Sequence, residues 1–154
     1  MKVLVVYDTV SPAKLTMKVA ETIGATLKEK GFEVDSFFVK DVDKGVIGGY
    51  DCLLAGGPTM YFRASKGIME FLDGLKGKEF SGKRAAAFDT QLGSRMSGNA
   101  AKAVDGKLQK LGFKMAAPPL VTYAEGKMNE MNMKEGELEK AKSWALTVAE
   151  ALSK

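Results

Sequence analysis

The chain has 154 residues, of which 45% are hydrophobic and 27% charged, and its formal net charge is +4. These values fit one globular domain, residues 1–154, with a continuous core. The lysines alternate with acidic residues instead of clustering with aromatics, so no nucleic-acid partner is expected. One cysteine and no histidine exclude an intrachain disulfide and disfavour a metal site or histidine acid–base chemistry.

The first apolar run is residues 3–7, and its β-branched residues predict a strand. The run is too short for a membrane span and lacks a signal-peptide cleavage site, so we expect a cytoplasmic protein that is not inserted in a membrane. A helix follows, with Ser11 able to cap it and Pro12 able to occupy its first position. Its apolar stripe ends before Gly31 and consists of Leu15, Val19, Ile23 and Leu27.

The segment between this strand and its helix carries the hydroxyl side chains of Thr9 and Ser11, and Thr16 follows in the helix. Backbone N–H groups at a helix start can bind phosphate, and neighbouring hydroxyls can assist them without a charged side chain. An ordinary capped helix explains the same residues. Taken alone, the segment leaves both interpretations open.

Two further strands are expected before the middle of the chain. Residues 32–39 alternate only partly, which is typical of a strand near a sheet edge. Residues 51–55 are apolar without alternation, which predicts a strand buried on both faces of a parallel sheet. Cys52 lies in that second run and is therefore expected to be an inert core thiol.

The sequence Gly56-Gly57-Pro58 predicts a turn out of this buried strand, and Ser65 is a candidate cap for the next helix. That helix would bury Ile68, Phe71, Leu72 and Leu75. Tyr61 and Phe62 lie in the connection, where a flat ligand binds in open parallel sheets. Alternatively, the two rings only pad the loop against the helices.

Residues 84–88 form another short apolar run, expected to be a central strand, and residues 89–97 are expected to be a loop. The next helix would bury Ala101, Val104, Leu108 and Leu111. A fifth strand begins at residues 113–115 and resumes at 120–123 after two prolines. Residues 128–133 are Met-rich and without a period, which favours a loop over a soft metal site. The last helix would bury Leu138, Ala141, Ala145, Val148, Ala149 and Leu152.

Strand and helix therefore alternate five times. This order predicts an α/β fold, a doubly wound five-stranded parallel sheet with strand order 2-1-3-4-5 and helices on both faces. In that order the first, third and fourth strands flank the switch point, where ligands bind. The segments that follow those strands, residues 8–14, 56–63 and 89–97, are expected to meet at one edge of the sheet.

Four short motifs resemble those of the flavodoxin family: Val5-Val6-Tyr7-Asp8-Thr9, residues 16–20, residues 56–59 and residues 86–88. The chain is similar over essentially its whole length to short-chain flavodoxins and to the flavodoxin-like domain of flavodiiron proteins. The resemblance implies non-covalently bound FMN, with its phosphate in the first loop and its isoalloxazine ring between the second and third loops. It also implies a monomer that shuttles single electrons between redox partner proteins.

The resemblance places FMN against the three segments at the switch point, with no catalytic side chain. The residues it implies are Asp8, Thr9, Val10, Ser11, Pro12, Ala13, Lys14, Leu15, Thr16, Pro58, Thr59, Met60, Tyr61, Phe62, Asp89, Thr90, Gln91, Leu92, Gly93 and Met96. Either Tyr61 or Phe62 would stack on one face of the ring. Flavodoxins usually place a tyrosine on the other face, and here Leu92 or Met96 would cover it.

The first loop departs from the family motif Ser/Thr-x-Thr-Gly-x-Thr. It lacks the glycine and is about two residues longer when Thr16 is matched to the last threonine of the motif. Pro12 removes one N–H donor, whereas Lys14 adds a positive charge. The phosphate site is thus expected to be built differently from that of other family members.

Three functions remain open at this stage. An FMN electron carrier needs no side-chain acid or base, which agrees with the absence of histidine, and it is the expected function rather than an enzyme with its own substrate. An FMN-dependent NAD(P)H or quinone-type reductase would need an open pocket for a second substrate. A flavodoxin-like binding module that has lost the cofactor is the third possibility, supported by the altered first loop.

Overall fold

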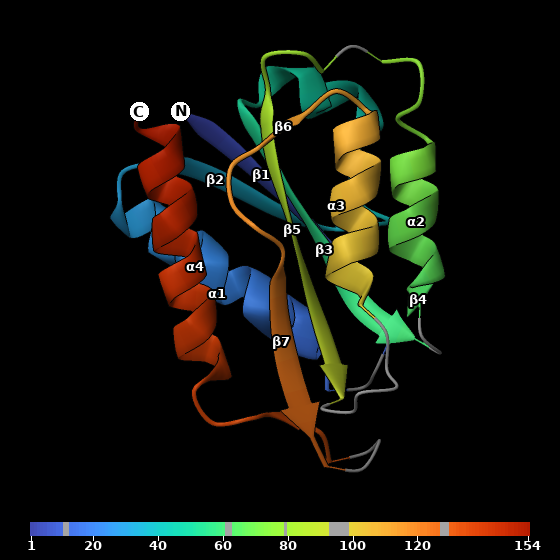
Figure 1. Ribbon diagram of the computed structural model, residues 1–154, viewed down its shortest axis with the longest axis vertical. Helices are drawn as coiled ribbons and strands as arrows, with labels where there is room; N and C mark the ends of the chain where they lie inside the picture. Colours follow the sequence, from blue (N-terminus) through green and yellow to red (C-terminus); the bar gives the residue numbers. More distant parts are fainter. Residues whose placement is uncertain (11–12, 61–62, 79, 93–98, 127–129) are drawn as a thin grey trace.

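The computed structural model describes residues 1–10, 13–60, 63–78, 80–92, 99–126 and 130–154. Its sheet contains five longer strands: β1 (Lys2–Tyr7), β2 (Glu33–Phe38), β3 (Cys52–Met60), β5 (Arg84–Leu92) and β7 (Leu120–Glu125). They lie in the order β2-β1-β3-β5-β7, and neighbouring strands run parallel. This is the predicted 2-1-3-4-5 order, with the predicted edge strand at the edge (Figure 1).

Three two-residue strands extend this sheet. β6 (Lys114–Met115) pairs in parallel with β5, as expected for a fifth strand interrupted by prolines. β4 (Arg63–Ala64) turns back against the end of β3. β8 (Asn132–Met133) pairs antiparallel with the end of β7, so the prediction of a loop over residues 128–133 is wrong at its last two residues. Pairing with β7, not local sequence, makes them a strand.

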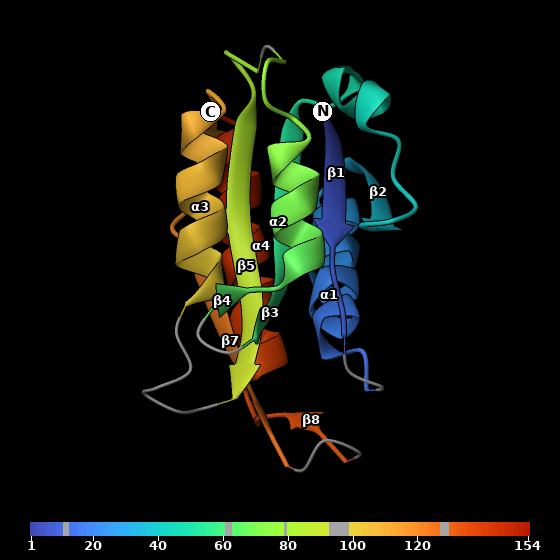
Figure 2. The ribbon, with the colours of Figure 1, turned by 90° about the vertical axis from the view of Figure 1, so that its right-hand side faces the viewer.

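Two helices cover each face of the sheet (Figures 1 and 2). α1 (Leu15–Glu29) and α4 (Glu137–Leu152) pack on one face, where Val5, Leu54 and Phe88 are buried. α2 (Lys66–Asp73) and α3 (Ala100–Lys110) pack on the other face, where Leu4 and Leu53 are buried. A short 3-10 helix, η1 (Lys44–Gly49), links β2 to β3. The alternation of the two faces along each strand is what a parallel sheet under helices requires.

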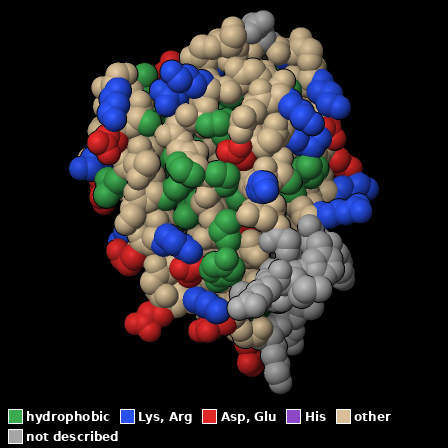
Figure 3. Space-filling view, in the orientation of Figure 1, with side chains coloured by type: hydrophobic (Ala, Val, Ile, Leu, Met, Phe, Trp, Pro, Cys, Tyr) green, Lys and Arg blue, Asp and Glu red, His purple; other side chains and the backbone are tan. Residues whose placement is uncertain are grey.

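None of the helices in the described part of the chain has both the length and the apolar character that a membrane span requires. The two termini lie together at one end of the fold (Figure 1). Acidic and basic side chains are interspersed over the face seen in Figure 3, without a large area of one sign. The charge pattern of this face agrees with the mixed distribution of lysines and acids in the sequence.

β3 and β5 are both longer than the sequence predicts. Gly56, Gly57 and Pro58 continue β3 because they pair in register with residues 88–90 of β5. The predicted turn at residues 56–58 is therefore wrong, and the chain leaves the sheet only after Met60. Likewise, residues 89–92 end β5 instead of starting the third loop. Pro58 lies beyond Gly56, the last residue of β3 that pairs with β1, and a proline without an N–H is tolerated at such a strand end. Its carbonyl accepts the Ser65 N–H of the returning chain.

Gly56 is required by the packing of β5 beneath it. A Cβ atom at position 56 would lie 2.3 Å from Cδ2 of Phe88, well inside van der Waals contact. The Phe88 ring is itself fully buried between β5 and helices α1 and α4. The glycine therefore lets the large ring of Phe88, on the neighbouring strand, fill the core against the middle of β3.

Candidate functional site

The carboxyl ends of β1, β3 and β5 meet at one edge of the sheet, and α1, α2 and α3 all begin there (Figure 2). Because β1 and β3 are neighbours although β2 and α1 separate them in the chain, this edge is the switch point of the sheet. Three helix N-termini converge on it. The first N–H groups of a helix have no acceptor within the helix. At each of the three termini, the question is therefore which group accepts them.

Helix α1 begins at Leu15, three residues later than predicted. Its N-cap position is Lys14, which adopts the left-handed conformation (φ 51°, ψ 46°) and makes no side-chain capping bond. The prediction that Ser11 caps this helix and Pro12 begins it is wrong; those two residues lie outside the described part of the chain. Leu15 is the first residue of this segment that the core buries, at 3% exposure, whereas Val10 is 52% exposed. Core packing therefore fixes the helix start.

No side chain among the described residues accepts a hydrogen bond from the first-turn N–H groups of α1. Lys14 is exposed at the same point, and its ammonium adds a positive charge to the positive end of the helix dipole. The donor set at the start of α1 is therefore of one kind, N–H groups and an ammonium. This is the chemistry that binds a phosphate.

Helix α3 shows the opposite state. The N–H group of Ala100 donates to Thr59 Oγ1 at 3.0 Å, and that of Ala101 donates to Asp89 Oδ2 at 3.1 Å. The third N–H group, of Lys102, donates to the N-cap residue Asn99 at 2.9 Å. Side chains from β3, β5 and the cap thus each satisfy one donor. The first three N–H groups of α3 are therefore all hydrogen-bonded within the protein.

Helix α2 begins after Ser65, as predicted, but the Ser65 hydroxyl does not cap the helix. It donates instead to Oδ2 of Asp8, at 2.5 Å. The other oxygen of Asp8 accepts the Thr9 N–H at 2.9 Å, and the residue is almost fully buried. A Cβ at position 67 would lie 2.5 Å from Oδ2 of Asp8, so Gly67 allows the carboxylate to pack against the first turn of α2.

Side-chain hydrogen bonds join every pair of the three chain segments at this edge. Asp8 and Ser65 join the first to the second. The hydroxyls of Thr16 and Thr90 lie 2.7 Å apart, buried, and join the first to the third. Thr59 Oγ1 donates to Asp89 Oδ2 at 3.3 Å and joins the second to the third. The resemblance matched Thr16 to a phosphate-binding threonine, but its hydroxyl here is bonded to Thr90.

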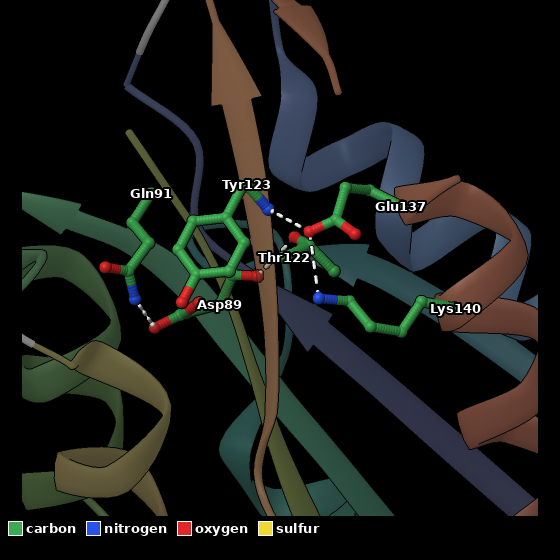
Figure 4. Close-up of polar contacts among 6 residues, drawn as sticks. All are labelled: Asp89, Gln91, Thr122, Tyr123, Glu137 and Lys140. Carbon is green, nitrogen blue, oxygen red and sulfur yellow. Dashed lines mark hydrogen bonds and ion pairs between the residues drawn. The ribbon is translucent and has the colours of Figure 1, made fainter. Parts of the chain in front are cut away.

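The Asp89 carboxylate is the most enclosed polar group of the site, with no exposed surface. Oδ2 accepts from Thr59 and from the Ala101 N–H. It also accepts from Gln91 Nε2 at 3.1 Å, as Figure 4 shows. Oδ1 has no hydrogen-bond partner among the described residues. Burial raises the pKa of Asp89, and the bonds to Ala101, Thr59 and Gln91 offset part of that rise. The backbone carbonyl of Asp89 accepts the Thr122 hydroxyl at 2.6 Å.

A second polar group fixes the end of β7, next to β5. The Tyr123 N–H donates to Glu137 Oε1 at 2.8 Å, and Lys140 pairs with the same oxygen at 2.9 Å (Figure 4). The ammonium groups of Lys140 and Lys134 lie 5.0 and 5.9 Å from the centre of the Tyr123 ring. No motif in the sequence marks these residues, because their contacts join segments that are separated in the chain.

The predicted site residues are brought to this edge in different ways. Asp8, Thr16, Asp89, Thr90 and Gln91 are buried, so their side chains build the floor of the site. Leu92 ends β5 at 48% exposure and can face a ligand. Leu15 contributes only backbone at this edge, since its side chain is in the core. Ser11, Pro12, Tyr61, Phe62, Gly93 and Met96 lie outside the described residues.

The described residues contain no cluster of three or more acidic or cysteine side chains suited to a metal ion. Cys52 is 1% exposed, and burial raises the pKa of its thiol to about 12. The prediction of an inert core thiol is confirmed. The described residues at this edge offer backbone N–H donors, hydroxyl groups and the Lys14 ammonium.

Fold and site define a doubly wound α/β protein in which the first N–H groups of α1, at the switch point, donate to no described side chain. The family model for flavodoxin matches residues 6–144. The chain belongs to the flavodoxin family. No curated protein sequence matches it significantly.

Solved structures show the same fold. An oxidised flavodoxin 2 from Bacillus cereus superposes with a TM-score of 0.82 at 21% identity, covering 97% of this chain and 99% of that one. A flavodoxin from the Archaea gives 0.79 at 21% identity, with both chains covered completely. The rubredoxin:oxygen oxidoreductase of Desulfovibrio gigas gives 0.81 at 23% identity over 99% of this chain and 36% of that longer one. The fold resemblance to flavodoxins and to a flavodiiron-type protein is confirmed.

Proposed function

We propose that the protein is an FMN-binding electron carrier that shuttles single electrons between redox partner proteins. The observation that carries this proposal is the start of α1, whose N–H groups have no side-chain acceptor among the described residues although those of α3 do. Membership of the flavodoxin family supplies the ligand class. Switch-point geometry supplies the place.

The residues present fit FMN. The backbone N–H groups at Leu15 and Thr16, with the Lys14 ammonium, would hold the phosphate, because they are donors without competing acceptors. The ends of β3 and β5 would flank the ring, with exposed Leu92 covering one face of it. FMN supplies the redox chemistry when bound. The protein orients it, and no side-chain acid or base is required.

Titration of the purified protein with FMN and with riboflavin tests the proposal. We expect quenching of FMN fluorescence with Kd in the micromolar range or below, a binding free energy of about −8 kcal/mol or more favourable. Riboflavin lacks the phosphate and should bind at least about tenfold more weakly, since charge-assisted bonds to N–H donors are lost. If about 50 µM protein, which is about 50 times a micromolar Kd, does not quench FMN fluorescence, the alternative of a binding module that has lost the cofactor is favoured instead.

The same proposal includes a monomeric, cytoplasmic protein whose residues 1–154 fold as one domain. One-electron transfer between two protein partners needs an exposed site and no second copy of the chain. Sedimentation at several concentrations should give one species of the monomer mass, and urea unfolding followed by two probes should give one coincident transition. A dimer would favour the reductase alternative, because related reductases are usually oligomeric.

A further inference from the structure

The carboxylate of Asp89 is bonded to both ends of the connection between β5 and α3. Gln91, which precedes the connection, donates its side-chain N–H to Oδ2 at 3.1 Å. Ala101, which follows it, donates its backbone N–H to the same oxygen at 3.1 Å. One atom therefore holds the point where the chain leaves the sheet against the point where the helix begins.

A third donor to the same oxygen comes from the end of β3. Thr59 Oγ1 donates to Asp89 Oδ2, at 3.3 Å, and also accepts the N–H of Ala100 at 3.0 Å. The Thr59 hydroxyl thus donates a hydrogen bond to β5 and accepts one from α3. Thr59, Asp89, Ala100 and Ala101 form one closed group, which we name the Asp89 clamp.

The clamp is out of reach of water on its α3 side. Asp89, Ala100 and Ala101 are 0% exposed. If either acceptor were removed, a buried N–H would be left without a partner, and solvent could not replace it. The geometry of the clamp is therefore held tightly only while both side chains are present.

Stability alone does not account for a carboxyl group at this position. Oδ1 is buried without a hydrogen-bond partner among the described residues, so the hydrogen bonds of the carboxyl group offset only part of its loss of solvation. Burial also raises the pKa of Asp89, which means that its charged form is disfavoured in the fold. A buried polar group that costs stability is commonly retained at a functional site.

We propose that Asp89 is a positioning residue that sets the separation between the end of β3 and the start of α3, and with it the space offered to the isoalloxazine ring. The inference rests on the proposed FMN function. Asp89 does not contact the ring, since its side chain is fully enclosed. It acts through Thr59 and through the first turn of α3.

The test compares flavin binding by Thr59→Val and Asp89→Ala with that of the unchanged protein. Both variants remove acceptors or donors of the clamp, and valine keeps the shape of threonine. The ring-binding half of the site should loosen, so we expect the Kd values of FMN and riboflavin to rise together by about tenfold. The ratio of the two Kd values should stay within about twofold, because the phosphate half is unchanged.

Two controls separate positioning from general stability. Thr122→Val breaks a buried hydrogen bond to the backbone carbonyl of Asp89 but leaves the clamp intact, so it should cost stability without changing either Kd by more than about twofold. Thr59→Ser keeps the hydroxyl and should restore binding relative to Thr59→Val. Wild-type flavin affinity in folded Thr59→Val and Asp89→Ala would overturn the inference, as would a loss confined to FMN.

A second measurement does not need flavin. Hydrogen exchange at the Ala101 amide should be at least about tenfold faster in Asp89→Ala than in Thr122→Val, because only the former removes the acceptor of that N–H group. Equal exchange in the two variants would overturn the clamp. If the unchanged protein binds no flavin, the proposed function fails, whereas this exchange measurement still decides whether the clamp exists.

Discussion

Helices α1 and α3 begin at the same edge of the sheet, on its opposite faces, and they differ in which groups accept their first N–H groups. At α3, three side chains from three places in the chain each accept one N–H. At α1, no described side chain accepts any, and the N-cap position is a lysine in the left-handed conformation. Both ends carry the positive pole of a helix dipole. Side chains accept the first N–H groups of α3, whereas no described side chain accepts those of α1.

The difference teaches where an anion can bind. A phosphate at α3 would have to displace Thr59 and compete with the carboxyl of Asp89, whereas no described side chain competes for the first N–H groups of α1. The family resemblance alone places the phosphate near the first loop. Comparison of the two helix starts gives a physical reason for that placement that does not depend on the missing glycine of the family motif.

The largest expected effect comes from reversing the charge at the open helix start. Lys14→Glu places a carboxylate beside the N–H donors of α1, where it repels a phosphate and can cap the helix itself. We expect the FMN affinity to fall by about 2 kcal/mol, roughly 30-fold, as for the loss of a charged hydrogen bond. Riboflavin affinity should not change. Fluorescence titration with both ligands measures this.

The matched control is Lys28→Glu, which makes the same change in net charge at the other end of α1. Lys28 is exposed in the last turn of the helix. Fourteen residues of helix place it about 21 Å from Lys14, beyond the Debye length of about 8 Å at physiological salt. Equal losses of FMN affinity in the two variants would mean that general charge, not the start of α1, governs binding.

The second effect concerns the carboxyl that meets α3. Because burial raises the folded pKa of Asp89, the stability that its protonated form provides is complete below the unfolded pKa of about 4 and is lost as pH rises through the folded value. The slope in that window is at most about 1.4 kcal/mol per pH unit. Asp89→Asn removes the titration, so the wild type should gain stability relative to this variant as pH is lowered toward 4.

Urea unfolding of both proteins across this pH range measures the difference in the free energy of unfolding. A difference that is constant with pH would show that Asp89 titrates alike in the folded and unfolded chains. A difference that grows with rising pH would reverse the sign, and would mean that the hydrogen bonds from Thr59, Gln91 and Ala101 outweigh the burial of the group.

The third effect compares the cap positions directly. Asn99→Ala removes the side chain that accepts the Lys102 N–H and should lower the free energy of unfolding by about 1 kcal/mol. Lys14→Ala removes no capping bond and should change it by no more than about 0.5 kcal/mol. Thermal or urea unfolding of the apoprotein decides this. Similar losses would show that Lys14 has a capping role that its conformation does not reveal.

The smallest effect is a gain. Lys14 has φ 51°, a conformation that glycine adopts at much lower cost. Lys14→Gly should therefore raise the free energy of unfolding by about 0.5 kcal/mol while weakening FMN through loss of the ammonium. Stability and ligand affinity would then move in opposite directions at one residue. A fall in both the free energy of unfolding and the FMN affinity would mean that Lys14 contributes to folding and not to binding alone.

Local patterns predicted most of the fold correctly. The apolar stripe of α1 and the continuous run in β3 depend on neighbours within a few residues, so periodicity and length identified them. Strand ends were predicted less well. Residues 56–60 and 89–92 contain glycine, proline and polar side chains that locally favour turns, and only their pairing with each other makes them strand.

The sequence predicted the location of the site but not the hydrogen bonds that build it. Topology brought the three segments to one edge, which the strand order implies. The bonds that build it join residues far apart in sequence: 57 residues separate Asp8 from Ser65, and 74 separate Thr16 from Thr90. No local signal marks such a pair. The start of α1 was missed for the same reason, since Ser11-Pro12 is a valid local start that core packing at Leu15 overrides.

The packing of Phe88 under Gly56 has a consequence for how this sequence can vary. A side chain at position 56 would meet the Phe88 ring at 2.3 Å, so neither position can change alone toward a larger combined volume. In related sequences, any side chain at position 56 should be accompanied by a smaller residue at position 88. The two positions, 32 residues apart, are therefore expected to covary. A side chain can be accepted at position 56 only after a smaller residue has replaced Phe88.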